Sequence, residues 1–199
     1  MITGALIAGC TVLVLSGLIF WANPRRPTNR AVVVCSLNVV AWLLSIHFMV
    51  SVSVEEGLPW MRLTTAIGAL IPFYLWVVKE TISNQVFSRK DILKKGKSGI
   101  FACAFLCVMP FTEWFIPEGS TASNRLYGPA YFGYIIGFIL LCLILAQRTF
   151  PRVKTITGLA KLELQIWLLI RTLACLTVIL FMVIRSVLGI TLNFQVAVV

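Results

Sequence analysis

Six apolar runs, each close to the length of a membrane-spanning helix, dominate this sequence. A helix needs about 20 residues to cross the ~30 Å hydrocarbon core of a bilayer. None of the runs alternates apolar and polar residues with the period of two that marks the strands of a membrane barrel. The sequence therefore predicts an all-α fold, a polytopic transmembrane helix bundle. We expect six complete helices and the start of a seventh, at residues 2–21, 31–52, 61–78, 99–116, 128–146 and 164–188, with the partial helix at 192–199.

The composition excludes a soluble protein. Of the 199 residues, 59% are hydrophobic and 12% are charged, which is about half the charged share of a soluble domain. A soluble enzyme could not bury this much apolar surface, and a disordered chain would not contain it. We expect one membrane-embedded domain of residues 1–199. The net charge of +10 lies mostly in short connections between apolar runs, which favours contact with the lipid bilayer and argues against a nucleic-acid partner.

The charges in the connections predict the topology. The connections 23–30, 79–97 and 147–161 hold most of the basic residues. The intervening connections hold only Arg62 and Arg125 as basic residues. Those same connections carry four of the acids, which are Glu55, Glu56, Glu113 and Glu118. By the positive-inside rule, the basic connections are cytoplasmic and the N-terminus lies outside.

The outer connections are rich in aromatic residues, and one of them is long. Two interpretations stand: an aromatic belt at the membrane interface, or the rim of a ligand cavity. The loop 112–130 is the longest outer connection and mixes charges, aromatic rings and turn residues, so we predict that it forms an external sensing surface. The candidate residues for binding a signal or ligand are Trp60, Arg62, Glu113, Trp114, Arg125, Tyr127 and Tyr131.

The residues of a catalytic or metal site are missing from the pattern. His47 is the only histidine, and it lies near the outer end of the second run, with no acid inside a membrane segment beside it. A metal site needs several ligands, and a Ser–His–Asp arrangement needs an acid within reach. We therefore expect no enzyme activity, no catalytic residue, no metal and no cofactor. His47 is either a packing residue at the interface or a group that senses pH or a ligand.

Two arginines and one asparagine inside the apolar runs are further candidates for a functional role. Arg171 and Arg185 both lie in the sixth run, and an intramembrane charge is costly unless it is satisfied. For Arg185 we favour snorkelling to the outer interface. Arg171 either snorkels or faces the bundle, where its acceptor would be Asn38, Ser36 or a helix carbonyl. Asn38 itself is interpreted as a residue that holds helices together, with ligand contact as the alternative.

Proline and glycine residues predict where the helices bend or approach closely. Pro72 lies inside the third run and should kink that helix. Gly133 and Gly137 form a GxxxG pair in the fifth run. This spacing permits close approach of two helices, either within the bundle or across a dimer.

The combined pattern resembles the N-terminal seven-transmembrane region of bacterial sensor histidine kinases. The likeness rests on the connection Asn23–Arg30 followed by Ala41-Trp42, on Trp60–Leu63 leading into Ala69–Phe73, and on Tyr127-Gly128-Pro129 with Gln147-Arg148 at the other end of that run. The stretch from Lys161 to Gln165 before the sixth run also fits. The resemblance covers essentially the whole chain. The chain departs from the family pattern in two ways. The seventh helix stops after a few residues, and no kinase core follows.

This resemblance implies a membrane-embedded sensory input domain of a two-component system. Such a domain detects an extracellular or membrane-borne signal and relays it by helix rearrangement to a cytoplasmic histidine kinase module, here in cis if the chain is truncated. It also implies a multi-pass location in the bacterial inner membrane and a homodimer. The alternative hypotheses are a small transporter or channel-like protein and a non-catalytic accessory subunit of a membrane complex.

Overall fold

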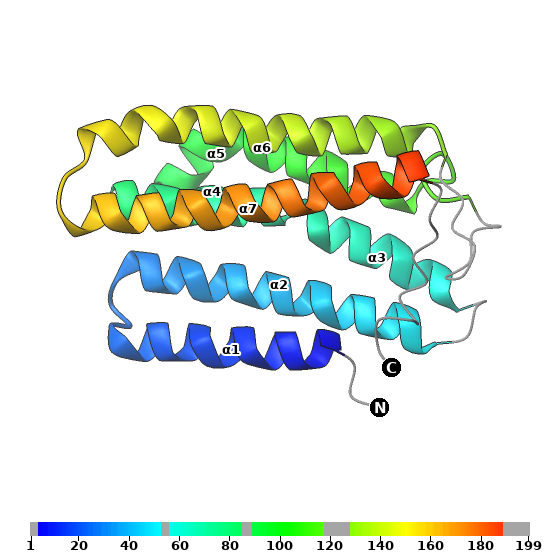
Figure 1. Cartoon of the computed structure of the whole chain (residues 1–199), viewed down its shortest axis with the longest axis horizontal. Coiled ribbons are helices and arrows are strands. Elements are labelled where there is room, and N and C mark those ends of the chain that lie inside the picture. Colours follow the sequence, from blue (N-terminus) through cyan, green and yellow to red (C-terminus); the bar gives the residue numbers. More distant parts are fainter. Residues whose placement is uncertain (1–3, 53–55, 85–88, 118–127, 189–199) are drawn as a thin grey trace. The chain divides into compact units, whose positions relative to one another are not determined.

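The computed structural model describes residues 4–52, 56–84, 89–117 and 128–188 (Figure 1). Within these ranges the chain forms helices and turns and no strand, so the predicted all-α class is confirmed. Four of the helices are long and apolar enough to cross a membrane, namely Gly4–Ala22, Pro27–Ser51, Gly57–Ser83 and Ala130–Thr155. The chain is therefore a membrane protein.

The helices divide between two compact units, Met1–Leu141 and Cys142–Val199. The boundary falls inside a single helix, α6. In chain order the elements are α1 Gly4–Ala22, α2 Pro27–Ser51, α3 Gly57–Ala69, α4 Ile71–Ser83, α5 Arg89–Val108, the 3-10 turn η1 Met109–Phe111, α6 Ala130–Thr155 and α7 Leu159–Leu188. The predicted partial helix at 192–199 lies outside the described residues.

Several helices extend beyond the apolar runs that predict them. The expected connection 79–97 is largely helical, because α4 continues to Ser83 and α5 begins at Arg89. The expected connection 147–161 is also largely helical, because α6 continues to Thr155. Lysine, arginine, glutamine and glutamate are good helix formers. The apolar pattern therefore marks the part of each helix that suits the membrane and not the ends of the helix.

The expected helix 99–116 ends early. The α-helix α5 stops at Val108, and a 3-10 turn follows. Pro110 in that turn has no backbone N–H and cannot continue an α-helix. The hydroxyl of Thr112 donates to the carbonyl of Met109 at 2.7 Å and closes the turn. The prediction of helix through residues 112–116 is therefore wrong, and this stretch folds back as a non-helical strap.

Unit 1 is built around α2, which packs against α1, α3 and α4. Figure 1 shows α1 and α2 as an antiparallel hairpin at the start of the chain. Helix α1 buries only Gly9 and Ser16 and exposes large apolar side chains such as Val14 and Leu18. In water such exposure would be costly, but against lipid it costs nothing. The outside of the unit is therefore suited to hydrocarbon.

The hairpin turn between α1 and α2 is closed by Asn29. Its side-chain amide donates to the carbonyls of Ile19 at 2.8 Å and Asn23 at 3.0 Å, and Asn29 is 8% exposed. The guanidinium Nε of Arg30 donates to the carbonyl of Pro24 at 2.8 Å. Pro27 occupies the first turn of α2, where its missing N–H is not needed. The distinctive Asn-Pro-basic motif is thus a device that joins two helices.

The third apolar run is broken at Leu70, which ends α3 and precedes α4. The N–H of Leu70 donates to the carbonyl of Ile67 at 3.1 Å, a tightened turn. Pro72 has no N–H to donate back to the preceding turn. On the other side of the break, a Cβ on Gly68 would lie 3.3 Å from Nε1 of Trp42. The break therefore coincides with a close approach between α3 and α2.

Unit 2 contains the second half of α6 and helix α7. Between them Gly158 has φ +67°, in the left-handed region that favours glycine. The N–H of Ile156 donates to the carbonyl of Arg152 at 3.1 Å and ends α6, and that of Lys161 donates to the carbonyl of Gly158 at 3.1 Å at the start of α7. These bonds close the short turn that joins the two helices.

Candidate signal-binding site at the outer strap

The strap formed by residues 112–117 is the central feature of the candidate site. It is held by backbone hydrogen bonds to the segment just before α6. The N–H of Gly128 donates to the carbonyl of Phe115 at 3.0 Å, and that of Ala130 donates to the carbonyl of Trp114 at 3.1 Å. The two segments, which are separated by a gap of undescribed residues, are therefore paired at the end of α6.

Phe115 anchors the strap in the core of unit 1. Phe115 is 0% exposed and Ile116 is 1% exposed. The Phe115 ring meets the rings of Tyr131 and Tyr134 edge-on, with centroids 5.6 Å and 5.1 Å apart. These residues belong to one hydrophobic cluster that also includes Met61 of α3. Edge-on aromatic pairs add to the stabilisation from burial, so the strap is part of the fold and not a loose loop.

Gly128 is required where the strap meets α6. A Cβ at this position would lie 2.0 Å from the carbonyl oxygen of Trp114. That oxygen is backbone and also accepts the hydrogen bond from Ala130, so it cannot move aside cheaply. The absence of a side chain at Gly128 is what allows the two segments to pair.

Arg62 ties the strap to helix α3. Its Nη2 donates to the carbonyl of Ile116 at 2.9 Å, and its Nε is buried without an acceptor in the part of the chain that the structure describes. The hydroxyl of Tyr134 in α6 donates to the carbonyl of Thr65 at 3.1 Å. The strap and the first half of α6 are thus both attached to α3 within a few residues of each other.

The helix break at Leu70 supplies acceptors for two more links. Because the N–H of Leu70 bonds to Ile67, it is not used on the carbonyl of Ala66 as a regular α-helix would require. The carbonyl of Ala66 accepts instead from the thiol of Cys107 at 3.2 Å. The side-chain amide of Asn38 in α2 donates to the carbonyl of Ile67 at 3.4 Å. Side chains from two neighbouring helices therefore meet the backbone at the break.

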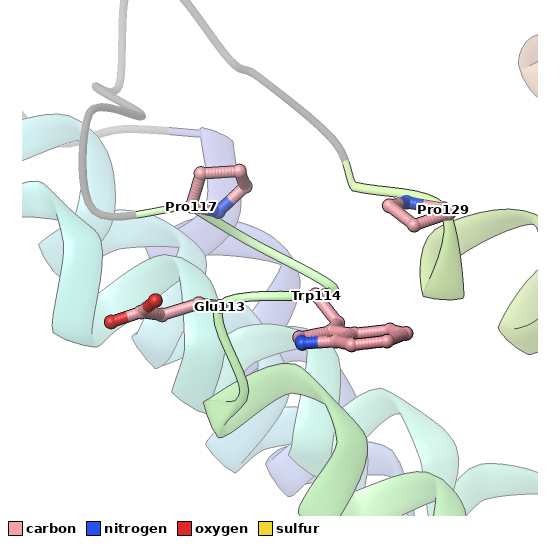
Figure 2. A pocket seen from close by; sticks show the side chains of 4 residues that line it. All are labelled: Glu113, Trp114, Pro117 and Pro129. Carbon is pink, nitrogen blue, oxygen red and sulfur yellow. The ribbon is translucent and has the colours of Figure 1, made fainter.

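A cavity of about 430 Å³ opens beside the strap. Its lining residues are Glu113, Trp114, Pro117 and Pro129. Figure 2 shows the indole of Trp114 across from the rings of the two prolines, with Glu113 on the neighbouring turn. Trp114 is 74% exposed. Ligand cavities are commonly mostly apolar with a few polar groups and measure about 300–1,000 Å³, so this cavity can hold a small ligand.

The structure brings together most of the residues predicted for this site. Glu113 and Trp114 line the cavity, while Arg62 and Tyr131 contact the inner side of the strap. Trp60 lies at the edge of the hydrophobic cluster, and its ring stacks on that of Phe48 with centroids 4.7 Å apart. Arg125 and Tyr127 lie outside the described residues.

The residues that organise the site were missing from the sequence-based candidates. They are Phe115 and Ile116, which anchor the strap, Gly128, which permits the pairing, and the prolines at 117 and 129. One signal could have found the anchor, since Phe115 and Ile116 are apolar residues inside a loop that also carries charges and turn residues. The position of Gly128 against a distant carbonyl leaves no such signal.

The remaining candidates are scattered over the fold. His47 lies beside the hydroxyl of Ser51, at 3.5 Å. A Cβ on Gly133 would meet no atom within 4 Å, and one on Gly137 would meet a methyl group of Leu106 at 3.6 Å. The side chain of Arg185 is not among those described. His47, Gly133 and Gly137 are not among the residues that line the cavity at the strap.

A buried ion pair lies at the opposite end of unit 1, at the end of α4. The Nζ of Lys79 is 2.5 Å from Oε1 of Glu80, and both side chains are almost fully buried. The amide of Asn84 donates to the other carboxylate oxygen of Glu80 at 2.9 Å. Sequence reasoning placed these residues in a solvated connection. The two charges are paired in this buried setting, and the end of α4 is closed by Asn84, whose backbone N–H and side-chain amide both donate to the carbonyl of Glu80.

Comparisons of the chain with protein families, with curated proteins and with solved structures give no match. Among the described residues, no group of three or more histidine, cysteine, aspartate or glutamate side chains could hold a metal ion. The candidate site is therefore defined by its own geometry, which is a cavity beside the strap, a buried anchor and a set of links to a broken helix.

Proposed function

We propose that this chain is a membrane-embedded sensory input domain. It receives an extracellular or membrane-borne signal at the outer strap and relays it by helix rearrangement to a cytoplasmic histidine kinase module. In this proposal the chain crosses a bacterial inner membrane six times, begins a seventh crossing, and has its N-terminus outside. A homodimer belongs to the same proposal, because it follows from the resemblance to sensor kinases.

The observation that carries the proposal is the attachment of the strap to α3 beside a helix break. Arg62 holds the strap at Ile116, and α3 ends at Ala69, two turns further along. The cavity is lined by Glu113, Trp114 and Pro117 of the same strap. A ligand that moves the strap would therefore move α3 relative to α4. Breaks at proline are places where a helix can take two arrangements.

The binding free energy that such a relay requires can be given a scale. A ligand shifts the balance between two arrangements only through its different affinity for them. Moving a population from 1:99 to 99:1 takes roughly 5.5 kcal/mol of differential binding. A cavity of about 430 Å³ has the size of a small-molecule site. The volume of the cavity at the strap therefore lies in the range of a site for one small ligand.

The charge distribution supports the assigned sides of the membrane. The first half of α5 carries Lys90, Lys94 and Lys95, and these side chains are half-buried or exposed. They lie at the end of unit 1 that is remote from the strap, since α5 leads from them to η1. Basic groups next to a membrane helix are attracted to anionic headgroups of the cytoplasmic leaflet. The strap then faces the outside.

The proposal is tested in a fusion of residues 1–199 to a histidine kinase core. The substitution Arg62→Met removes the link between strap and α3, and the matched control Arg148→Gln changes an exposed arginine in α6. We expect Arg62→Met to change autophosphorylation in membranes about fivefold, because a lost charged hydrogen bond is worth about 1 kcal/mol or more. The control should stay within twofold of the unmodified fusion.

The same fusions can also contradict the proposed relay. Membrane insertion and monodispersity are first checked by fluorescence-detected size exclusion. If Arg62→Met inserts normally and its kinase activity equals that of Arg148→Gln and of the unmodified fusion, the strap does not feed the kinase. The proposed relay is then wrong.

A further inference from the structure

Helices α6 and α7 of unit 2 each bury one stripe of side chains. On α7 the buried stripe is Leu164, Trp167 and Arg171, at spacings of three and four residues. On α6 it is Cys142, Leu145 and Thr149, at the same spacings. This is the helical repeat of a packed face. A single cation, Arg171, therefore lies on an otherwise apolar buried stripe, and it is only 4% exposed.

The hydrogen bonds of Arg171 leave most of its donors unused. A guanidinium carries five N–H donors and no acceptor. The Nη2 of Arg171 donates to the carbonyl of Cys142. Its Nε and Nη1 are buried and have no acceptor in the described part of the chain. Buried donors of a charged group are normally paired, because leaving them unpaired costs more than a neutral group would.

A second unpartnered donor lies beside Arg171. The indole Nε1 of Trp167 is buried, and it too has no acceptor among the described residues. The Cζ of Arg171 is 5.4 Å from the centroid of the Trp167 ring, which places the cation over the aromatic face. Two buried side chains on successive turns thus present three nitrogens, Nε and Nη1 of Arg171 and Nε1 of Trp167, that find no acceptor in the described residues.

Among the described residues of unit 2, no acid side chain lies within reach of the charge of Arg171. Glu163 is the only acid in residues 142–199. It precedes Arg171 by eight residues, or about 12 Å along the helix, which is beyond hydrogen-bond reach. The carbonyl of Cys142 and the Trp167 ring supply partial negative charge, but neither is an anion.

We propose that Arg171 and Trp167 form a buried binding site for a carboxylate. A planar carboxylate matches the fork of a guanidinium and can accept from two N–H groups at once. Its single negative charge balances the one cation, whereas a doubly charged phosphate would leave excess charge buried. The indole Nε1 of Trp167 donates to the same anion. This site is in unit 2 and does not depend on the function proposed for the strap.

The carboxylate can come from one of two sources. Arg171 lies about 18 Å along α7 from Leu159, so the site is deep in the part of α7 that suits the bilayer. A small soluble carboxylate would reach it by a hydrated path. The carboxylate of a free fatty acid would reach it from the lipid, with its alkyl chain left among the lipid tails. Both sources present the same chemistry to Arg171 and Trp167.

The experiment measures the thermal unfolding of the purified 199-residue protein in nanodiscs of zwitterionic lipid. Sodium formate is titrated into sulfate buffer in one arm, and oleic acid is mixed into the nanodisc lipid in the other, with oleyl alcohol as the matched control. We expect at least one carboxylate to raise Tm relative to its control. A response to formate alone identifies a soluble anion, and a response to oleic acid alone identifies a lipid-borne one.

Variants assign the response to the proposed donors. Arg171→Gln removes the charge and should abolish the shift in Tm. Trp167→Phe keeps an aromatic side chain but replaces the indole with a phenyl ring that has no N–H, and it should raise the apparent Kd for radiolabelled oleate or formate about fivefold. The control is Arg148→Gln, which changes an exposed arginine in the same unit and should leave binding unchanged.

Two results would overturn the site. One is that neither carboxylate raises Tm beyond sulfate or oleyl alcohol in the unmodified protein. The other is that Trp167→Phe and Arg148→Gln bind with the same affinity as the unmodified protein, which holds even if Arg171→Gln fails to fold. In either case the free N–H groups of Arg171 are satisfied by something other than a carboxylate.

Discussion

The turn between α1 and α2 and the outer strap both fix a connection in unit 1, but they do so in opposite ways. In the turn, Asn29 reaches the carbonyls of Ile19 and Asn23, which are at most ten residues away in the chain. In the strap, Arg62 reaches Ile116 across 54 residues. The turn is closed by its own side chains, whereas the strap is held by parts of the chain that are distant in sequence.

The two connections therefore differ in whether the contacts that hold them are local or long-range in sequence. A connection closed from within can be recognised as a motif and needs no partner elsewhere. A connection held from a distance transmits displacement, because the residues that hold it belong to other helices. In the proposed function the strap receives the signal, whereas the turn only joins two helices. Four substitutions test this contrast, and they are ordered by the size of the expected effect.

The largest effect is expected at the anchor of the strap. Phe115→Ala should lower the free energy of unfolding by about 3 kcal/mol, because a fully buried aromatic side chain is removed and a cavity remains. The neighbour Trp114, which is 74% exposed, serves as the control, and Trp114→Ala should cost less than about 0.5 kcal/mol. Denaturant titration in detergent micelles measures both. Equal losses at the two positions would show that the strap is not anchored.

The next effect is expected at the junction of the strap with α6. Gly128→Ala places a Cβ against the carbonyl of Trp114, and forced overpacking of this kind costs about 2 kcal/mol. Gly133→Ala is the matched control, since a Cβ there would meet nothing within 4 Å. Its stability should be unchanged or slightly higher, because alanine favours a helix over glycine. A tolerated Gly128→Ala would contradict the paired strap.

A smaller effect is expected in the turn between α1 and α2. Asn29→Ala removes two hydrogen bonds to carbonyls that are partly buried, which should cost about 1.5 kcal/mol. Unlike Arg62→Met, it should leave the activity of the kinase fusion unchanged, because the turn is closed locally. Chemical unfolding and autophosphorylation of the same variant provide the two measurements. A large change in kinase activity would show that the turn, like the strap, affects the kinase.

The smallest effect is expected at Arg30. Its Nε donates to the carbonyl of Pro24 in an exposed setting, where water can replace the bond. Arg30→Gln should therefore change the free energy of unfolding by less than about 0.5 kcal/mol. Denaturant titration of Arg30→Gln and Asn29→Ala under identical conditions compares their free energies of unfolding. A larger loss for Asn29→Ala would show that Asn29 is the residue that closes the turn. A loss as large as that of Asn29→Ala would show that the two residues share it.

The apolar runs predicted the helices well because lipid acts on each helix separately. Every helix in a bilayer must present apolar side chains and satisfy its own backbone, so α1, α2 and α6 can be read from local composition. The same rule explains the errors at helix ends. Once a helix leaves the hydrocarbon, charged residues such as Lys79 and Lys154 continue it, and the apolar pattern no longer marks its course.

The candidate site was predicted only in outline. Glu113 and Trp114 were found because charged and aromatic residues stand out in an outer loop. Phe115 and Gly128 were not, because nothing local says that one ring is fully buried or that one Cβ would meet a carbonyl fourteen residues earlier. The burial of Lys79 with Glu80 was missed for the same reason.

The sequence by itself determined that this chain is an all-helical membrane protein, because apolar runs of this length are stable only in lipid. It also marked the connection between α1 and α2, whereas the closure of that turn by Asn29 became evident from the structure. Only the tertiary structure decided where Arg62 and Arg171 find their carbonyls and where α3 is held. Those contacts join segments far apart in sequence, and their energies depend on geometry that no single segment contains.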